Sequence, residues 1–61
     1  MLLKIWWQGG DVSYLEAISV ETHKNQEEIV VWTNNEDTET YYITVGAFYV
    51  STPQGWEEIN I

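Results

Sequence analysis

"TYYITVGAFYVST", residues 40 to 52, is the stretch of sequence that decides the fold. It is rich in β-branched and aromatic residues, which favour strands, but it is long for one strand, since strands usually run for about five or six residues. Gly46 lies in its middle, where a glycine permits a bulge or a bend. The run is therefore predicted to bend and to serve two sheet edges.

Strand and turn signals alternate along the rest of the chain. Leu2 to Trp7 is apolar apart from Lys4, and "QGGD" (8–11) has the glycines and the aspartate of a hairpin turn. "IVVWT" (29–33) predicts a strand that is buried on at least one face. The other expected elements are turns at "KNQEE" (24–28) and "TPQG" (52–55) and a terminal strand at "WEEINI" (56–61).

Residues 12 to 23 admit two interpretations. The segment is rich in β-formers and alternates over part of its length, which favours a strand, either unbroken or bent near Ala17. The alternative is a short helix over residues 13–24, because Ser13 and Glu16 have the spacing of a capping box. The sequence favours the strand.

Together these signals predict an all-β fold of five or six antiparallel strands in chain order. Such a meander is expected to curl into a small half-open barrel with an SH3-like appearance. If residues 13–24 form a helix, the fold is instead α+β. The 61 residues form a single domain, 1–61, and a chain of this length buries only roughly 60% of its unfolded surface.

The charge of the chain is strongly one-sided. Ten acidic residues face two lysines and no arginine, which gives a formal net charge of −8. A field of this sign repels nucleic acid and anionic membranes and attracts basic protein surfaces. The alternative is that the charge only keeps an aromatic-rich small domain soluble. The chain has no cysteine and its first residues predict a strand rather than a signal peptide, so a cytoplasmic location is expected.

Few residues offer catalytic or metal-binding chemistry. His23 is the only histidine and is interpreted as a turn residue, and no serine lies in a nucleophile-elbow sequence. "NNEDTE" (34–39) lacks the alternating pattern and the distal glutamate of a calcium loop. We therefore expect no enzyme activity, no cofactor and no metal site.

The acids are expected to gather at the two ends of the sheet. If residues 12–22 are one unbroken strand, the turn with Asp11 lies at the same end as the turn with Glu36 and Asp37. A break at Ala17 would reverse this arrangement. The opposite end would hold Glu27, Glu28, Glu57 and Glu58.

The aromatic residues exceed what a small core easily hides. The chain has four Trp, four Tyr and one Phe. Because adjacent residues on a strand face opposite ways, one of Trp6 and Trp7 and one of Tyr41 and Tyr42 should point outward. Exposed aromatic residues beside acids are typical of a protein-binding patch.

In size and charge the whole chain resembles the small inhibitor proteins that phages and mobile elements make against host nucleases. This group includes DNA-mimicking anti-restriction proteins, uracil-DNA glycosylase inhibitors and many anti-CRISPR proteins. The resemblance rests on composition and on no shared motif. It implies that carboxylates occupy a Lys- and Arg-lined nucleic-acid site of a host enzyme, which would be the partner.

The residues expected to contact such a partner come from two groups. The acids are Glu36, Asp37 and Glu39, with Asp11 adding to the field, and Trp7 or Tyr41 supplies apolar anchorage. Two alternatives remain open. The chain is instead a structural or assembly module that dimerises through an aromatic sheet face, or a ligand-binding barrel that uses Trp6, Trp32 or Trp56 as a stacking platform for a sugar or base.

Overall fold

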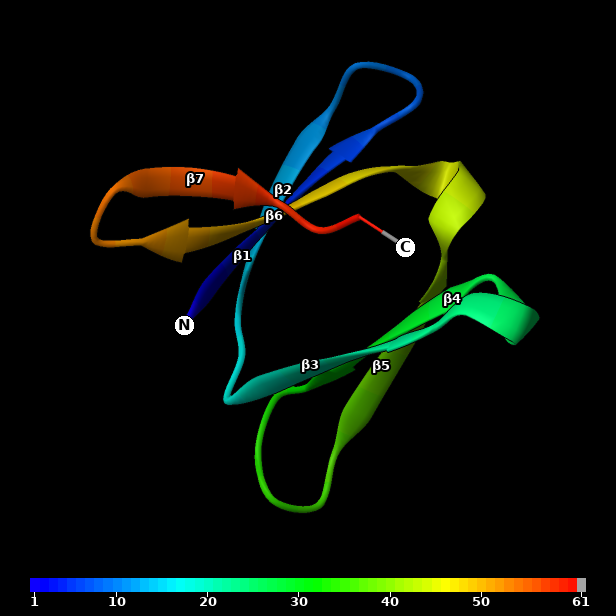
Figure 1. The fold of residues 1–61 in the computed structure, drawn as a ribbon, viewed down its shortest axis with the longest axis vertical. Coiled ribbons are helices and arrows are strands. Elements are labelled where there is room, and N and C mark those ends of the chain that lie inside the picture. The colour runs from blue at the N-terminus through cyan, green and yellow to red at the C-terminus, as the bar shows by residue number, and fades with distance from the viewer. Residues whose placement is uncertain (61) are drawn as a thin grey trace.

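The computed structural model describes residues 1–60 and shows an all-β fold of two antiparallel sheets (Figure 1). The strands are β1 (Leu2–Trp7), β2 (Val12–Glu16), β3 (Ser19–His23), β4 (Glu28–Trp32), β5 (Thr38–Tyr42), β6 (Gly46–Thr52) and β7 (Gly55–Glu58), and the 3-10 turns are η1 (Lys24–Gln26) and η2 (Ile43–Val45). The all-β prediction is confirmed. The helix considered for residues 13–24 is wrong, because that segment forms β2 and β3 and pairs with β1 and β4.

The sheets contain four and three strands, in the orders β2-β1-β6-β7 and β3-β4-β5. Within each sheet the paired strands are neighbours along the chain, except for β1 and β6, whose pairing joins the two ends of the chain. Figure 1 shows the four-stranded sheet above and the three-stranded sheet below, connected at two corners. The structure has seven strands where the sequence predicts five or six, and they form two sheets instead of one meander in chain order, because β1 pairs with β6.

The first corner lies where the chain passes from β2 to β3. The N–H of Ala17 donates to the carbonyl of Met1, on the side of the four-stranded sheet, and the N–H of Ile18 donates to the carbonyl of Trp32 at the end of β4. Consecutive residues thus bond to different sheets. Ala17 is buried, so a small side chain lies where the sheets meet. Of the two forms considered for this strand, the structure has the one that bends near Ala17.

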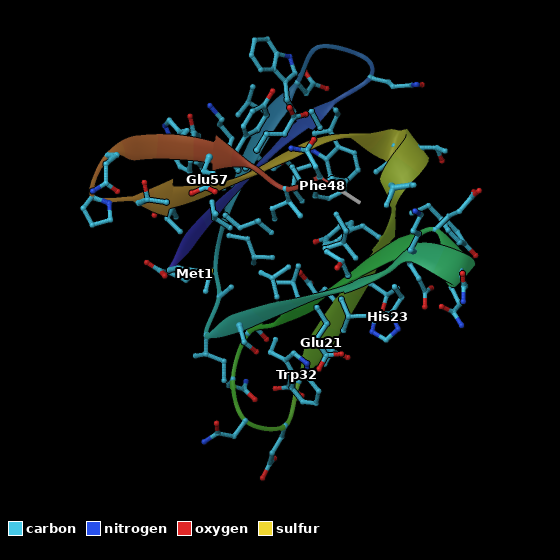
Figure 2. All side chains as sticks on the ribbon, viewed as in Figure 1. Met1, Glu21, His23, Trp32, Phe48 and Glu57 are labelled. Atoms are coloured by element: carbon cyan, nitrogen blue, oxygen red, sulfur yellow. The ribbon has the colours of Figure 1, made fainter. Side chains whose placement is uncertain are left out.

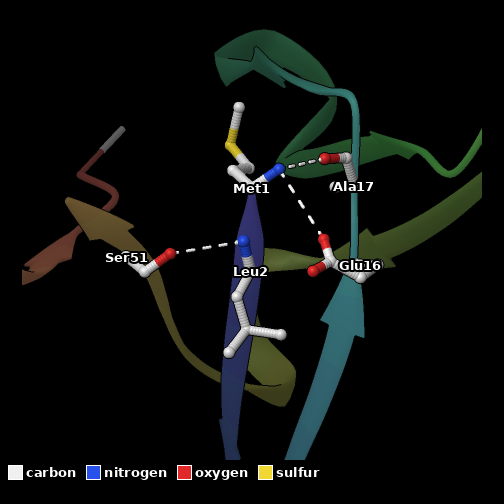
Figure 3. A network of polar contacts seen from close by, with 5 residues as sticks. All are labelled: Met1, Leu2, Glu16, Ala17 and Ser51. Carbon is white, nitrogen blue, oxygen red and sulfur yellow. Dashed lines mark hydrogen bonds and ion pairs between the residues drawn. The ribbon is translucent and has the colours of Figure 1, made fainter.

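Polar contacts around Met1 hold this corner (Figure 3). The Met1 amino group donates to the carbonyl of Ala17, and it lies 3.7 Å from Oε2 of Glu16. On the other side of β1, the N–H of Leu2 donates to Oγ of Ser51 at 3.3 Å. The start of β1 is therefore tied to both of its neighbouring strands.

The second corner divides the run of residues 40–52. The run forms β5, then the turn η2, and then β6, so its two halves belong to different sheets. Gly46 begins β6, where a Cβ atom would lie 2.2 Å from the carbonyl oxygen of Trp6. Only a residue without a side chain allows β6 to approach β1 so closely. The prediction that this run serves two sheet edges is confirmed.

The core lies between the inner faces of the two sheets. Leu3 and Ile5 of β1 alternate with outward residues, as do Ile29 and Val31 of β4, and all four are almost fully buried. Phe48, labelled in Figure 2, and Ala17 complete the buried set. The predicted turns at 8–11 and 52–55 are present, with Gly10 and Gly55 at positive φ. The terminal strand ends at Glu58, and Ile61 lies outside the described residues.

Candidate functional site

The loop between β4 and β5 is fixed by the side chain of Asn34. Its Oδ1 accepts hydrogen bonds from the backbone N–H groups of Glu36 (2.8 Å) and Asp37 (2.9 Å). Its Nδ2 donates to Oδ2 of Asp37 at 2.6 Å. The N–H of Thr33 closes the loop by donating to the carbonyl of Asp37 at 3.1 Å. The carboxylates of this loop are therefore presented on a defined backbone, by the local bonding that asparagine favours in turns.

Glu39 follows this loop on β5, an edge strand of its sheet. The hydroxyl of Tyr41 donates to Oε2 of Glu39 at 2.9 Å, which gives the carboxylate a fixed direction. Partial burial raises the pKa of Tyr41 to about 12, and the hydrogen bond to Glu39 and its charge add to the effect. We call Glu36, Asp37 and Glu39 the acidic edge.

Asp11 is not part of the acidic edge. It ends the turn between β1 and β2, and Figure 1 places that turn and the β4–β5 loop at opposite ends of the molecule. The expected grouping required an unbroken strand over residues 12–22, and the chain instead changes sheets at Ala17. Of the four predicted acids, the structure brings together Glu36, Asp37 and Glu39.

Trp7 and Tyr41 face the interior. Their rings contact edge to face with centroids 5.9 Å apart, and both pack against the core. Nε1 of Trp7 also donates to Oγ of Ser13 at 2.8 Å. The outward members of the two pairs are Trp6, half exposed, and Tyr42, which is 64% exposed. One residue of each pair does point outward, as expected, but the residues selected as anchors are the inner ones.

A group of aromatic residues that the sequence did not single out covers the outer side of the four-stranded sheet. It comprises the exposed Trp6, Tyr14 and Trp56 and the half-buried Tyr49, and we call it the aromatic face. The rings of Tyr14 and Trp56 lie 6.0 Å apart, although they come from opposite edges of the sheet. Nζ of Lys4 lies 4.8 Å from the ring centre of Tyr49 and 4.6 Å from that of Trp56.

The position of Lys4 in the sequence could have revealed the aromatic face. It interrupts an apolar strand, so its parity marks the side that faces water, and Trp6 shares that parity. The register then brings Tyr14 and Tyr49 beside Lys4 on either side. The pairing of β1 with β6 joins distant parts of the chain, so it was not available from the sequence alone.

The outer side of the three-stranded sheet carries a smaller polar cluster, labelled in Figure 2. Glu21 accepts hydrogen bonds from Nε1 of Trp32 at 3.2 Å and lies 3.1 Å from Nε2 of His23. The hydrogen bond with His23 and that with Trp32 hold the pKa of the Glu21 carboxyl below its usual value. His23 ends β3 directly before η1, at the turn where the sequence placed it.

A cavity of about 190 Å³ opens beside the start of β6. It is lined by Ile29, Ile43, Gly46, Ala47, Phe48, Glu58, Ile59 and Asn60. Pockets for small molecules usually measure about 300–1,000 Å³. Trp6, Trp32 and Trp56, the tryptophans considered as stacking platforms, do not line it. The cavity therefore gives no support to the ligand-binding barrel.

Within residues 1–60, no three His, Cys, Asp or Glu side chains are grouped so that they could hold a metal ion. The same residues include no helix with the length and apolar character needed to cross a membrane.

The acidic edge lacks positively charged neighbours in the part of the chain that the structure describes. Within 4 Å, the Met1 amino group pairs with Glu16, and Glu21 has His23 as a neighbour, which is a charged partner only when its ring is protonated. Lys4 lies against aromatic rings instead of carboxylates. The charges at Glu36, Asp37 and Glu39 are thus left to water or to a partner. Comparisons of the chain with known protein families, curated proteins and solved structures found no match.

Proposed function

We propose that this chain is a small acidic inhibitor, of the kind that phages and mobile elements encode, which acts in the host cytoplasm. It is not an enzyme and uses no cofactor. Its partner is a host nuclease or CRISPR effector, and it occupies the basic site where that enzyme binds nucleic acid. The observation that carries the proposal is the acidic edge, where three carboxylates lie on an ordered loop and strand without a positively charged neighbour.

The geometry of the acidic edge suits a surface built to hold phosphates. Glu39 lies on β5 and Asp37 directly precedes that strand, and side chains two residues apart along a strand are spaced by about 7 Å. Carboxylates accept strong, charge-assisted hydrogen bonds from Arg and Lys, as phosphate oxygens do. Glu36 adds a third charge from the tip of the loop.

The acidic edge is also ordered before a partner arrives. Asn34 holds the loop, and Tyr41 holds Glu39. Less conformational freedom is lost on binding when the interacting groups already have their bound arrangement. Preorganisation therefore favours tight binding by a surface of only a few side chains.

The proposal is tested by affinity capture from a bacterial lysate with three forms of the tagged chain. The test variant carries Glu36→Gln, Asp37→Asn and Glu39→Gln, and the control carries Glu27→Gln, Glu28→Gln and Glu57→Gln, which remove the same charge elsewhere. The wild type and the control should retain a basic nucleic-acid-binding protein that elutes at moderate salt, and the test variant should lose it. Equal retention by the two variants would remove the acidic edge from the proposal.

A second candidate function is supported by the aromatic face. Exposed aromatic residues gathered on one sheet are typical of an interface, so the chain would be an assembly module that pairs through this sheet. Sedimentation of the purified chain separates the two candidates. Dimers that persist at high salt and are abolished by Trp56→Ala would favour the module, and a monomer at all salt concentrations would exclude it.

A further inference from the structure

The aromatic face already holds one cation, the side chain of Lys4. Its Nζ lies within 5 Å of the ring centres of both Tyr49 and Trp56. Cations bind aromatic rings at this range, within about 6 Å of the ring centre. Lys4 is one of only two lysines in a chain with ten acids, yet it contacts rings. The face is therefore a cation-binding surface whose occupant comes from the chain itself.

Carboxylates border this surface. In the strand register Tyr49 pairs with Glu58, and Leu2 pairs with Glu16 at the end of the same sheet. Both acids are exposed and share the outward side with their neighbours across the strands. A ring-lined surface with an acidic border attracts a cation from a distance and provides it with π faces on contact.

The rings remain accessible although Lys4 lies among them. Tyr14 is 60% exposed, Trp6 50% and Trp56 43%. These flat faces suit a guanidinium group best, because it is planar, stacks on aromatic rings and is more weakly hydrated than an ammonium group. A second copy of this chain is a poor occupant, because each copy carries a net charge of −8 and has no arginine.

We propose that the aromatic face binds an arginine side chain of a basic partner protein, and that this guanidinium displaces Lys4 from the rings of Tyr49 and Trp56 and contacts the ring of Tyr14, which lies 6.0 Å from that of Trp56. The inference rests on the proposed function only for the basic character of the partner. It adds a second contact surface, on the other sheet from the acidic edge. Lys4 acts as the internal competitor for that surface.

The test uses a short synthetic oligo-arginine peptide carrying a fluorescent label, and measures its affinity for the full chain by anisotropy at two salt concentrations. Two exposed tyrosines on opposite sheets form a matched pair, Tyr14 at 60% and Tyr42 at 64% exposure. Tyr14→Ala should weaken binding about two- to fivefold, the effect of losing one exposed cation–π contact, and Tyr42→Ala should leave it unchanged. Tyr14→Phe keeps the π face and should bind as the wild type does.

The two lysines form a second matched pair. Lys4→Gln and Lys24→Gln change the net charge equally, but only Lys4 occupies the rings. Lys4→Gln should therefore tighten peptide binding more than Lys24→Gln does. Equal effects of the two lysine variants, or equal effects of the two tyrosine variants, would overturn the inference.

The same peptide separates this inference from the proposed function. Binding that depends on the acidic edge and ignores Tyr14→Ala would remove the aromatic face and leave the proposed function standing. Peptide binding that depends on Tyr14 and is unchanged by neutralisation of the acidic edge would support the inference and would contradict the proposed role of that edge. Self-association through the aromatic face, with no peptide binding, would overturn the inference in favour of a second copy.

Discussion

At the scale of single residues, Asn34 is the side chain on which the acidic edge depends. It makes three hydrogen bonds within its loop, to Glu36 and Asp37. We expect Asn34→Ala to lower the free energy of unfolding by about 1 kcal/mol, which is the typical net contribution of one intramolecular hydrogen bond to stability. Asn35→Ala, at the exposed neighbouring position, is the control and should change it little. Urea denaturation of both variants checks this, and equal losses would contradict the role given to Asn34.

Tyr41 makes a second prediction at this scale, because its pKa is raised to about 12 in the folded chain. An unfolded tyrosine titrates near pH 10. The neutral hydroxyl is favoured in the folded state, so its contribution to stability is complete below about pH 10 and is lost as the pH rises towards 12. The difference in unfolding free energy between wild type and Tyr41→Phe should fall over this window only. A difference that stays constant to pH 12 would contradict the burial of this hydroxyl.

The same hydroxyl is sensitive to its partner. Glu39→Gln removes the negative charge next to Tyr41 while keeping an oxygen acceptor. The pKa of Tyr41 should fall, since a nearby carboxylate opposes the formation of phenolate, but it should stay above its usual value because burial is the larger cause. Ultraviolet titration of wild type, Glu39→Gln and a Tyr41→Phe reference measures it. An unchanged titration would mean that the two side chains do not interact in solution.

The residue scale also shows what sequence patterns can decide. Alternation correctly predicts that Trp6 and Trp7 face opposite ways, and likewise Tyr41 and Tyr42. It does not say which parity faces inward without a polar marker. Lys4 is that marker in β1. In β5 the corresponding polar residue, Glu39, is misleading, because it shares the inward parity of Tyr41 and yet stays exposed at the sheet edge.

At the scale of the elements, the two corners divide the strands between the two sheets. The corner at Gly46 tolerates no side chain, because a Cβ atom there would lie 2.2 Å from the carbonyl oxygen of Trp6. Gly46→Ala must push β6 away from β1, and we expect a loss of roughly 1–3 kcal/mol, the usual range for overpacking. Gly9→Ala is the matched control, since a Cβ at Gly9 meets nothing within 4 Å. Equal unfolding free energies for both variants would contradict the close approach.

The sequence predicted where the strands lie better than it predicted how many strands there are. It identified the long run of residues 40–52 as serving two sheet edges, which the structure confirms, and it named Ala17 as the place where the strand over residues 12–22 could break, which is where the chain changes sheets. The count rose to seven because each bend divides a continuous run into strands of different sheets. Where a bent strand changes partners depends on contacts with distant strands, such as those of Ala17 with Met1, and local propensity does not contain them.

At the scale of the whole molecule, the net charge of −8 acts on the fold as well as on partners. Like charges on a compact domain repel one another, and the described residues contain few ion pairs to offset this. Salt screens the repulsion, so the free energy of unfolding should rise between low and physiological ionic strength. Urea denaturation at the two ionic strengths measures it. A fall with added salt would mean that attractive ion pairs dominate instead.

The distribution of this charge could not be obtained from composition. The bend at Ala17 separates Asp11 from the acidic edge, and this bend was predicted only as one of two cases. Size, charge and aromatic content nevertheless suggested a protein-binding chain. The structure has two separate surfaces on which this hypothesis can be tested, the acidic edge and the aromatic face.

The most direct measurement is competition on the partner captured from the lysate. The affinity of that purified enzyme for its own nucleic acid would be measured at rising concentrations of this chain. If both occupy one site, the apparent dissociation constant should increase in proportion to the chain's concentration without reaching a limit, and the variant neutralised at Glu36, Asp37 and Glu39 should have little effect. An apparent dissociation constant that stays unchanged, or that levels off while nucleic acid and chain are bound together, would contradict the central claim.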